Sequence, residues 1–406
     1  MSSPTPSTIG QRMAQSARHT ARSVGSIRIP EAIMFFVLLT ASGLTGISTV
    51  GPIPTSHLLL SLICVYALLR RPTRDLGQFA VVIPVFAAAL FYIGMISMFA
   101  TPTEFAASWE TRLLRLLIVT FLVFVLASGR IDPRSAITGA FAALVVNIPL
   151  FYAGFVSNTY GGALTGLIGD KNVAGLAYTV VGLLMVWVTT RPSTRALVIA
   201  FSLTAAWLTE SRTSIAALVA GLVWMFLAPR LPVAGRWVLG VVLAFMVDLL
   251  AEDYSRIGVF SDRLGSDLLR SRIDAASRIR VEESGFFGQG LGEAYVVLDD
   301  RTWFFHNSYW SALVEGGWPW TIFLVAVTAL LIVRPFSRTA PPGHFVTQGA
   351  GIAILVCATR LGEVFYTNFW ALALGTSLYV LARPREPREL QPPLSPAEAA
   401  PGGVPR

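Results

Sequence analysis

A succession of long apolar runs constrains this chain more than any other feature of its sequence. About a dozen runs approach the roughly 20 residues that an α-helix needs to cross the hydrocarbon core of a bilayer. They are residues 32–50, 56–69, 79–100, 113–128, 136–156, 173–190, 196–209, 214–229, 237–251, 318–333, 347–359 and 367–382. The sequence therefore predicts an all-α, polytopic membrane protein with about 12 transmembrane helices.

Composition excludes a soluble fold of ordinary type. Of 406 residues, 54% are hydrophobic and only 13% are charged, whereas soluble domains carry about 25% charged residues. The formal net charge of +8 could suggest a nucleic-acid partner in a soluble protein. Here the basic residues lie mostly in short turns between apolar runs, which is typical of membrane orientation, and no nucleic acid is expected.

The distribution of arginine predicts which turns lie in the cytoplasm. With the N-terminus inside, every inside turn is basic, while the short outside turns are neutral or carry Glu104 and Glu110. Cytoplasmic turns carry the excess of Lys and Arg, so both chain ends are expected inside. The inside segments hold Arg12, Arg18, Arg22, Arg28, Arg70, Arg71, Arg74, Arg130, Arg134, Arg191, Arg195, Arg230, Arg236, Arg334, Arg338, Arg383, Arg385, Arg388 and Arg406.

Three regions follow from this reading. Residues 1–31 are expected to form an uncleaved cytoplasmic tail, 32–382 the transmembrane domain, and 383–406 a disordered cytoplasmic tail rich in Pro, Glu and Ala. Residues 252–317 form one long polar outside loop, and loops of this length are usually functional. Within it, apolar residues recur at helical spacing in a basic stretch, which predicts an amphipathic helix at the outer membrane surface. These residues are Leu269, Ile273, Ala276 and Ile279.

Two candidate sites lie at predicted outer helix ends. Arg212 sits between two apolar runs, with polar neighbours on both sides. Its planar fork of donors suits phosphate, although a snorkelling interfacial arginine would look the same. Asp170, Lys171 and Asn172 precede another run. Asp170 or Asn172 can cap that helix, and its N-terminus favours an anion; an ordinary cap beside a flanking charge is the alternative.

The long outside loop holds further candidates. Arg272 and Arg278 precede a glycine-rich stretch at 285–292, whose glycines permit a tight turn or close backbone approach to a ligand. The alternative for these arginines is contact with anionic lipid headgroups. His306 is the only histidine in this loop, and histidine can act as a base near neutral pH, although a lone histidine is more often structural.

Nothing in the sequence predicts a metal centre or a cofactor. Two cysteines lie inside apolar runs, and the four histidines are scattered without the spacing of a zinc motif. The adjacent carboxylates Asp299 and Asp300 could bind a cation, but a solvated turn is the favoured interpretation. We therefore expect no metal and no cofactor.

Taken in chain order, the polar motifs resemble the O-antigen ligase and O-antigen polymerase family. The similarity covers roughly residues 32–382, and it depends on the order of short motifs relative to the apolar runs. The motifs are Gly169-Asp170-Lys171-Asn172, Ser211-Arg212-Thr213, Gly288-Gln289-Gly290-Leu291-Gly292, His306-Asn307-Ser308-Tyr309 and Glu315-Gly316-Gly317.

The resemblance implies a metal-independent membrane glycosyltransferase of the helical GT-C type. Such an enzyme moves a glycan from a polyprenyl (undecaprenyl or decaprenyl) diphosphate carrier to an acceptor hydroxyl on the outer side of the cytoplasmic, or inner, membrane. The acceptor is a glycan or glycolipid, and membrane lipids surround the protein. Ligase and polymerase share the donor and differ in the acceptor, and both readings stay open.

The resemblance also implies residue roles. Arg212 matches the arginine of the family's Ser-Arg motif, and His306 matches the histidine before Asn-Ser. Arg272 matches the catalytic loop arginine best by spacing, with Arg278 as second choice, although the Trp that commonly follows that arginine is missing here. The expected catalytic residues are His306, Arg212 and Arg272. The expected substrate-binding residues are Arg278, Asp170, Lys171, Asn172, Asn307 and Tyr309.

Two other functions compete with transfer. A lipid-glycan flippase or other polysaccharide transporter would be expected to show inverted repeats and broken helices at the bilayer midplane. We find no repeat, and the polar residues concentrate at the outer rim. A scaffold or sensor would leave Arg212 and the cluster at 170–172 without a role.

Overall fold

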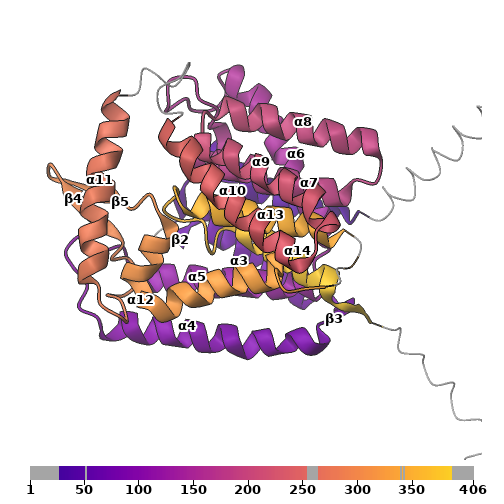
Figure 1. Cartoon of the computed structure of the whole chain (residues 1–406), viewed down its shortest axis with the longest axis horizontal. Coiled ribbons are helices and arrows are strands. Elements are labelled where there is room, and N and C mark those ends of the chain that lie inside the picture. The colour runs from indigo at the N-terminus through magenta and orange to yellow at the C-terminus, as the bar shows by residue number, and fades with distance from the viewer. Residues whose placement is uncertain (1–26, 51–52, 254–263, 339–340, 342, 386–406) are drawn as a thin grey trace, which may run out of the picture.

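The computed structural model describes residues 27–50, 53–253, 264–338, 341 and 343–385, and within them the chain is mostly helical, as predicted (Figure 1). The α-helices are α2 (Ile29–Thr45), α3 (Thr55–Leu68), α4 (Val82–Phe99), α5 (Trp109–Ala127), α6 (Pro133–Tyr152), α7 (Lys171–Val188), α8 (Pro192–Leu208), α9 (Arg212–Leu227), α10 (Val233–Asp253), α11 (Leu264–Glu283), α12 (Ser308–Val327), α13 (His344–Ala358) and α14 (Asn368–Leu381). Most of both predicted tails lies outside the described residues.

Short elements complete the chain. The 3-10 turns are η1 (Gly77–Val81), η2 (Gly166–Ile168) and η3 (Ala228–Arg230), and the π-helical turn η6 (Thr328–Val333) extends α12. Three antiparallel strand pairs occur: β1 (Thr49–Val50) with β2 (Ile53–Pro54), β3 (Arg74–Asp75) with β6 (Arg383–Pro384), and β4 (Tyr295–Leu298) with β5 (Arg301–Phe304).

Several helices are long and apolar enough to cross a membrane, which makes this a membrane protein. Among the described residues there are five: Gly77–Phe99, Pro133–Tyr152, Lys171–Val188, Arg212–Arg230 and Ser308–Val333. Five shorter apolar helices accompany them: Ile29–Thr45, Thr55–Leu68, Val233–Val247, His344–Ala358 and Asn368–Leu381. The helix that contains the run expected at 318–333 begins earlier, at Ser308, where Asn307 caps it, and its backbone breaks at Gly317, directly before that run.

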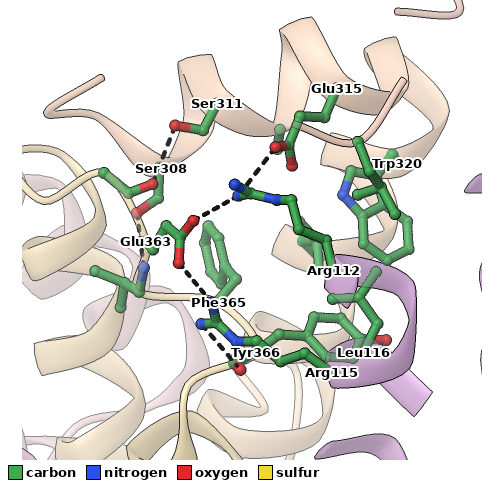
Figure 2. Close-up of a pocket in the computed structure, with 15 residues that line it drawn as sticks. Arg112, Arg115, Leu116, Ser308, Ser311, Glu315, Trp320, Glu363, Phe365 and Tyr366 are labelled. Carbon is green, nitrogen blue, oxygen red and sulfur yellow. Dashed lines mark hydrogen bonds and ion pairs between the residues drawn. The ribbon is translucent and has the colours of Figure 1, made fainter. Parts of the chain in front are cut away.

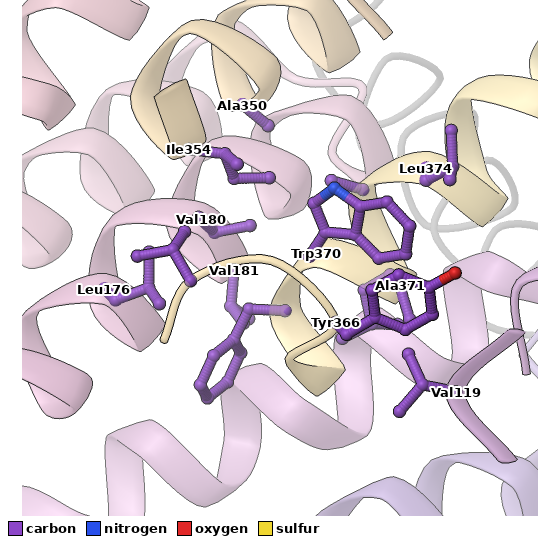
Figure 3. Close-up of a cluster of buried hydrophobic side chains, with 14 of the residues drawn as sticks. Val119, Leu176, Val180, Val181, Ala350, Ile354, Tyr366, Trp370, Ala371 and Leu374 are labelled. Atoms are coloured by element: carbon purple, nitrogen blue, oxygen red, sulfur yellow. The ribbon is translucent and has the colours of Figure 1, made fainter. Parts of the chain in front are cut away.

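The helices pack through small residues and one aromatic core. Gly221 of α9 faces Gly349 of α13 so closely that a Cβ on Gly221 would lie 2.7 Å from the Gly349 carbonyl oxygen. Without water to drive burial, such close backbone contact is what holds membrane helices together. In the middle of the bundle, Tyr366 stacks on Trp370 with ring centroids 4.8 Å apart, among aliphatic side chains of α5, α7, α13 and α14 (Figure 3).

The predicted inside turns gather at one end of the bundle. Arg130 donates from Nη1 to the Arg70 carbonyl oxygen at 2.6 Å, and the Arg385 N–H donates to the Thr73 carbonyl oxygen beside the β3–β6 pair. Arg134 lies over the Trp187 ring, 5.4 Å from its centroid. We call this the basic end. The alternation of basic and non-basic turns along the sequence is therefore a separation in space.

The opposite end carries α11 and the β4–β5 hairpin, and we call it the hairpin end. Figure 1 shows α11 running across this end of the bundle rather than along it. The predicted helix in the long loop is confirmed, but its apolar face does not lie open for lipid. Ile273 is buried against Val296 of the hairpin, Phe305 and Val314 of α12, which form a small second core. Only Ile279 of the predicted stripe is exposed.

Candidate functional site

His306 lies at the hairpin end, in the short link between β5 and α12. The preceding Phe305 is buried, and its carbonyl oxygen packs against Gly362 so tightly that a Cβ there would lie 1.8 Å away. This contact fixes the position of the histidine backbone. His306 Nδ1 is buried, with no hydrogen-bond partner among the described residues. Such an orphaned nitrogen is costly in a purely structural role.

Burial lowers the pKa of His306 to about 4, with the positive charge of Arg270 adding to the shift and the negative charge of Asp170 opposing it. The imidazole is therefore neutral at physiological pH, and it can accept a hydrogen bond or a proton. The two opposing charges come from α11 and from the residue that begins α7. Three distant segments of the chain thus meet around one ring.

Arg270 is the α11 arginine that faces this site. Burial raises the pKa of Asp274, one turn further along, while the charges of Arg270 and Arg360 lower it. Arg360 follows α13. Arg270 and Asp274 therefore share one side of α11, and that side faces both His306 and the end of α13.

The predicted Asp170–Asn172 site also lies here. Asp170 caps α7 by accepting from the Asn172 and Val173 N–H groups at 2.8 and 2.9 Å. It accepts a further hydrogen bond from Tyr160 Oη at 2.7 Å, and burial with this bond raises the pKa of Tyr160 to about 12. Lys171 Nζ lies over the Tyr160 ring, 5.4 Å from its centroid. The capping interpretation holds for Asp170, and its charge also reaches His306.

Arg212 begins α9, beside the first turns of α7. Ser211 and Ser214 hydrogen-bond through their hydroxyls at 2.8 Å, and a Cβ on Gly175 would lie 2.3 Å from the Ser214 Oγ. Thr179 Oγ1 donates to the Ser214 carbonyl oxygen at 3.0 Å. These contacts place the N-termini of α7 and α9 together. We call Asp170, Lys171, Arg212, Arg270, Asp274, His306 and Arg360 the His306 cluster.

Both predicted loop arginines lie outside this cluster. Arg272 forms a bidentate ion pair with Asp299 in the hairpin turn, at 2.9 and 3.1 Å, with both side chains exposed. Arg278 pairs with Glu282 on the same helix at 3.2 Å. Both arginines therefore contact acidic side chains rather than His306, and their assignment to the diphosphate stays a prediction. Helical spacing accounts only for Arg278, which falls on the face of the helix opposite to the apolar stripe.

Two other predicted binding residues have structural partners. Asn307 caps α12, its Oδ1 accepting from the Tyr309 and Trp310 N–H groups at 2.9 and 3.2 Å. Tyr309 Oη donates to the Leu355 carbonyl oxygen of α13 at 2.9 Å. Asn172 contributes its backbone N–H to the Asp170 cap. Asn307 and Tyr309 therefore hold the segment that carries His306, and their side chains are occupied by these bonds.

The glycine-rich stretch packs against a break in α12. Gly317 has φ 65° and ψ −162°, a backbone that interrupts the helix. Around this break, the Gln289 and Gly290 N–H groups donate to the carbonyl oxygens of Val314 and Glu315, and the Trp318 N–H donates to that of Phe286. A Cβ on Gly288 would lie 2.5 Å from the Gly317 nitrogen. The glycines do permit close backbone approach, and in the fold their partner is the backbone of α12.

A second group of charges was not predicted. Arg112 of α5 contacts Glu315 of α12 at 3.0 Å and Glu363 at 2.5 Å, while Arg115 contacts Glu363 at 2.6 Å (Figure 2). Burial would raise the pKa of Glu363, but Arg115 and Arg112 outweigh it and hold the pKa far below its usual range. We call these four residues the charge quartet. The arginine spacing on α5 was visible in the sequence, but no local pattern points to partners more than 200 residues away.

The quartet lines a cavity of about 60 Å³ together with Ser308, Ser311, Trp320 and Tyr366. Ser308, Ser311 and Glu315 lie on one side of α12, in the turns that follow His306. Ser308 Oγ accepts from the Val364 N–H at 3.0 Å, and Ser311 Oγ donates to the Gly362 carbonyl oxygen at 3.0 Å. The cavity is therefore built on the two segments that also hold His306.

Within the described ranges, no three His, Cys, Asp or Glu side chains form a group that could hold a metal ion. Compared with known proteins, the chain matches no protein-family model and no curated protein.

Proposed function

We propose that this protein is a membrane glycosyltransferase that moves a glycan from a polyprenyl diphosphate carrier to an acceptor hydroxyl. It would act as a polysaccharide ligase or polymerase of the O-antigen kind, without a metal. The observation that carries this proposal is a half-buried histidine, neutral at physiological pH, whose pKa responds to the charges of Arg270 and Asp170. It lies at the end of an apolar helical bundle where Lys171 begins α7 and Arg212 begins α9. A lipid-linked anion matches this arrangement, because its lipid suits the apolar bundle and its negative charge suits the basic side chains.

The chemistry requires cations in this position. As the glycosidic bond breaks, negative charge develops on the departing diphosphate, and fixed cations stabilise it. Arg212 begins α9, so the backbone donors of a helix N-terminus add to its guanidinium. His306 would accept the proton of the attacking hydroxyl. Binding of the diphosphate would offset the charge of Arg270, and the pKa of His306 would rise towards that of an effective base.

The proposed architecture is of the GT-C type with about 12 spans. Apolar helices too short for the usual span length would cross with a tilt or in a thinned bilayer. The short turns at the hairpin end carry few basic residues, so this end would face outside the cytoplasmic membrane. The basic end would face the cytoplasm. The donor and a glycan or glycolipid acceptor would then meet at the outer surface.

A flippase is the competing proposal, and the break in α12 is the observation that favours it. Discontinuous helices are frequent in transporters. In this chain the break is filled by backbone of the 286–292 segment, so it offers no open passage. That packing favours a fixed scaffold for chemistry.

A reconstituted system separates the two functions. Purified protein in proteoliposomes would receive a polyprenyl diphosphate-linked oligosaccharide and a glycolipid acceptor. Transfer releases free polyprenyl diphosphate and lengthens the acceptor, and both products are measured by mass spectrometry. Movement of intact donor across the bilayer, with no released carrier, would contradict the proposal and support the flippase.

Transfer should continue in the presence of EDTA. Because arginine and lysine side chains supply the positive charge, removal of divalent cations should change the rate by less than about twofold. The measurement is product formation in the same proteoliposomes before and after chelation. Loss of activity that magnesium or manganese restores would show that a metal is needed.

The pH dependence of kcat/KM should lack a step at the ordinary histidine pKa. This quantity reports the free enzyme, in which the pKa of His306 is lowered to about 4. Activity should therefore stay within about twofold between pH 7 and pH 5.5 and fall only as the pH approaches 4. An acidic limb centred near 6.5 would contradict the buried, neutral state of this ring.

The free energy of unfolding should decrease as the pH falls below the ordinary histidine pKa, because of the same ionisation of His306. The folded-state pKa of His306 lies below the ordinary histidine value of 6.5, so the unfolded chain binds the proton first as pH falls. The contribution of the neutral ring to stability is present above about 6.5 and is lost between there and about 4. His306→Gln should remove that part of the pH dependence of thermal unfolding.

A further inference from the structure

The charge quartet differs from the His306 cluster in its electrostatics. Its two guanidinium groups face two carboxylates, so the quartet carries no net charge. A phosphate brought here would compete with Glu315 and Glu363 for the arginines and would be repelled by both. Neutral hydroxyl groups would be accepted, because carboxylates accept and guanidinium groups donate. The quartet therefore suits a different part of the substrates from the cationic site.

An apolar groove lies on the bundle surface between α4 and α5. It has a volume of about 380 Å³, and its lining includes Phe86, Phe91, Leu113 and Leu117. Phe91 is 70% exposed, and α4 stands at the edge of the bundle (Figure 1). Only 22% of the residues in the most apolar stretch of Gly77–Phe99 are buried. From Leu113 to Phe124 the groove extends about 16 Å along α5. That is about half of the ~30 Å hydrocarbon core.

The groove and the quartet cavity adjoin each other along α5, and we treat them together as one candidate feature. Leu116 lines the quartet cavity, and its neighbour Leu117 lines the groove. Thr120 of the groove donates to the hydroxyl of Tyr366, which lines the cavity, at 3.4 Å. The feature therefore has a long apolar part along the bundle and a polar part, including an exposed edge of Glu363 at 41%, at the hairpin end.

We propose that the α4–α5 groove and the charge quartet bind the acceptor, as a lipid whose headgroup is neutral and rich in hydroxyl groups. The apolar chain lies between α4 and α5, and the first sugar of the headgroup hydrogen-bonds to the quartet. This inference rests on the proposed function and adds to it the class of acceptor: a glycolipid in the same membrane leaflet, rather than a soluble glycan.

The position of the quartet cavity along α12 supports this assignment. The quartet cavity begins at Ser308, two residues after His306, and is bounded by Gly362, whose backbone touches Phe305. A headgroup held there lies next to the segment that carries the proposed base. The anionic donor would approach from the other side, where α7, α9 and α11 supply the cations. The two substrates thus meet at His306 from opposite sides, sorted by charge.

The size of the cavity sets what can enter it. About 60 Å³ corresponds to roughly four to six water positions. That space admits the hydroxyl-bearing edge of one sugar ring, while the remainder of a headgroup would extend outward past Glu363. The cavity therefore binds the sugar next to the lipid, and the headgroup can carry further sugars outside the cavity.

Photocrosslinking in defined vesicles tests the proposal. A photoreactive phenylalanine analogue at Leu117 would report lipids in the groove, in phosphatidylcholine vesicles that contain labelled monoglucosyl diacylglycerol. Ala87→Trp fills the groove, since Ala87 lines it and is exposed. We expect crosslinking to fall at least fivefold in this variant. Val238→Trp, on the exposed face of α10, is the matched control and should leave crosslinking unchanged.

Competition identifies the headgroup. Unlabelled monoglucosyl diacylglycerol should compete at least tenfold better than phosphatidylglycerol with the same acyl chains, and Glu363→Gln should reduce that preference. Equal competition by the anionic lipid, or equal labelling of Ala87→Trp, would overturn the proposal. His306→Ala should bind the probe normally. If the wild-type protein binds the probe but transfers no glycan, the proposed function is contradicted and this inference is not. If it transfers glycan to a soluble acceptor and the groove is not labelled, this inference is contradicted and the proposed function is not.

Discussion

Replacing Arg212 by alanine should lower glycan transfer by roughly 10³-fold, while the protein inserts and purifies as the wild type does. The reason is the negative charge that develops on the departing diphosphate. One pre-positioned hydrogen-bond donor contributes about 10²–10³ to the rate of such a step, and an arginine that contacts a transferred phosphoryl group contributes about 10³–10⁵. Released polyprenyl diphosphate, measured in proteoliposomes under single-turnover conditions, gives the rate of the chemical step.

Two variants make the Arg212 result specific. Arg212→Lys keeps the charge but loses the planar fork, and it should recover only part of the rate. Arg134→Ala removes an arginine from the basic end, where it lies over Trp187, and it should transfer normally. Wild-type turnover in Arg212→Ala would remove Arg212 from the site.

Among the arginines of α11, Arg270→Ala should have a large effect and Arg272→Ala a small one. Arg270 acts on the pKa of both His306 and Asp274, so its loss should lower kcat/KM by about 10²-fold. Among the described residues, Arg272 pairs with Asp299 in the exposed hairpin turn, and its removal should change the rate by less than about twofold. The same assay on both variants, whose substitutions lie two positions apart on one helix, makes the comparison direct.

Arg278→Ala is the second control for α11, because Arg278 pairs only with Glu282 on the outer face. An additional readout distinguishes Arg270 from a structural residue: its loss should raise the pKa of His306, since one cation that lowers it is gone. The acidic limb of the pH profile should then move upward. A large loss in Arg272→Ala with normal Arg270→Ala would restore the sequence-based assignment.

The sequence alone predicted the kind of molecule and the sorting of its turns. Apolar runs require a membrane because the chain cannot hide that much apolar surface in water. The arginine-rich turns were predicted to lie on one side, and in the fold they meet at the basic end, as Arg130 and Arg70 show. Arg212 and Asp170 became candidates because each borders an apolar run, and His306 because it is the only histidine in the long loop.

Local pattern failed where a side chain's direction or a distant partner decided the role. Arg270, Arg272 and Arg278 stand close together in the sequence, and only the packing of Ile273 against the hairpin and α12 sets which of them faces His306. The sequence did not show that Asn307 and Tyr309 also form structural bonds to α12 and α13.

What the sequence determined by itself was the membrane-embedded helical class, the separation of basic from non-basic turns, and the polar residues at the helix ends. These follow from hydropathy and charge, which act on each segment independently. The tertiary structure decided the charge quartet, the closed break at Gly317 and the choice of Arg270. Each of these depends on contacts between segments far apart in the chain, such as Arg112 with Glu363, and no periodicity along the sequence encodes such a distance.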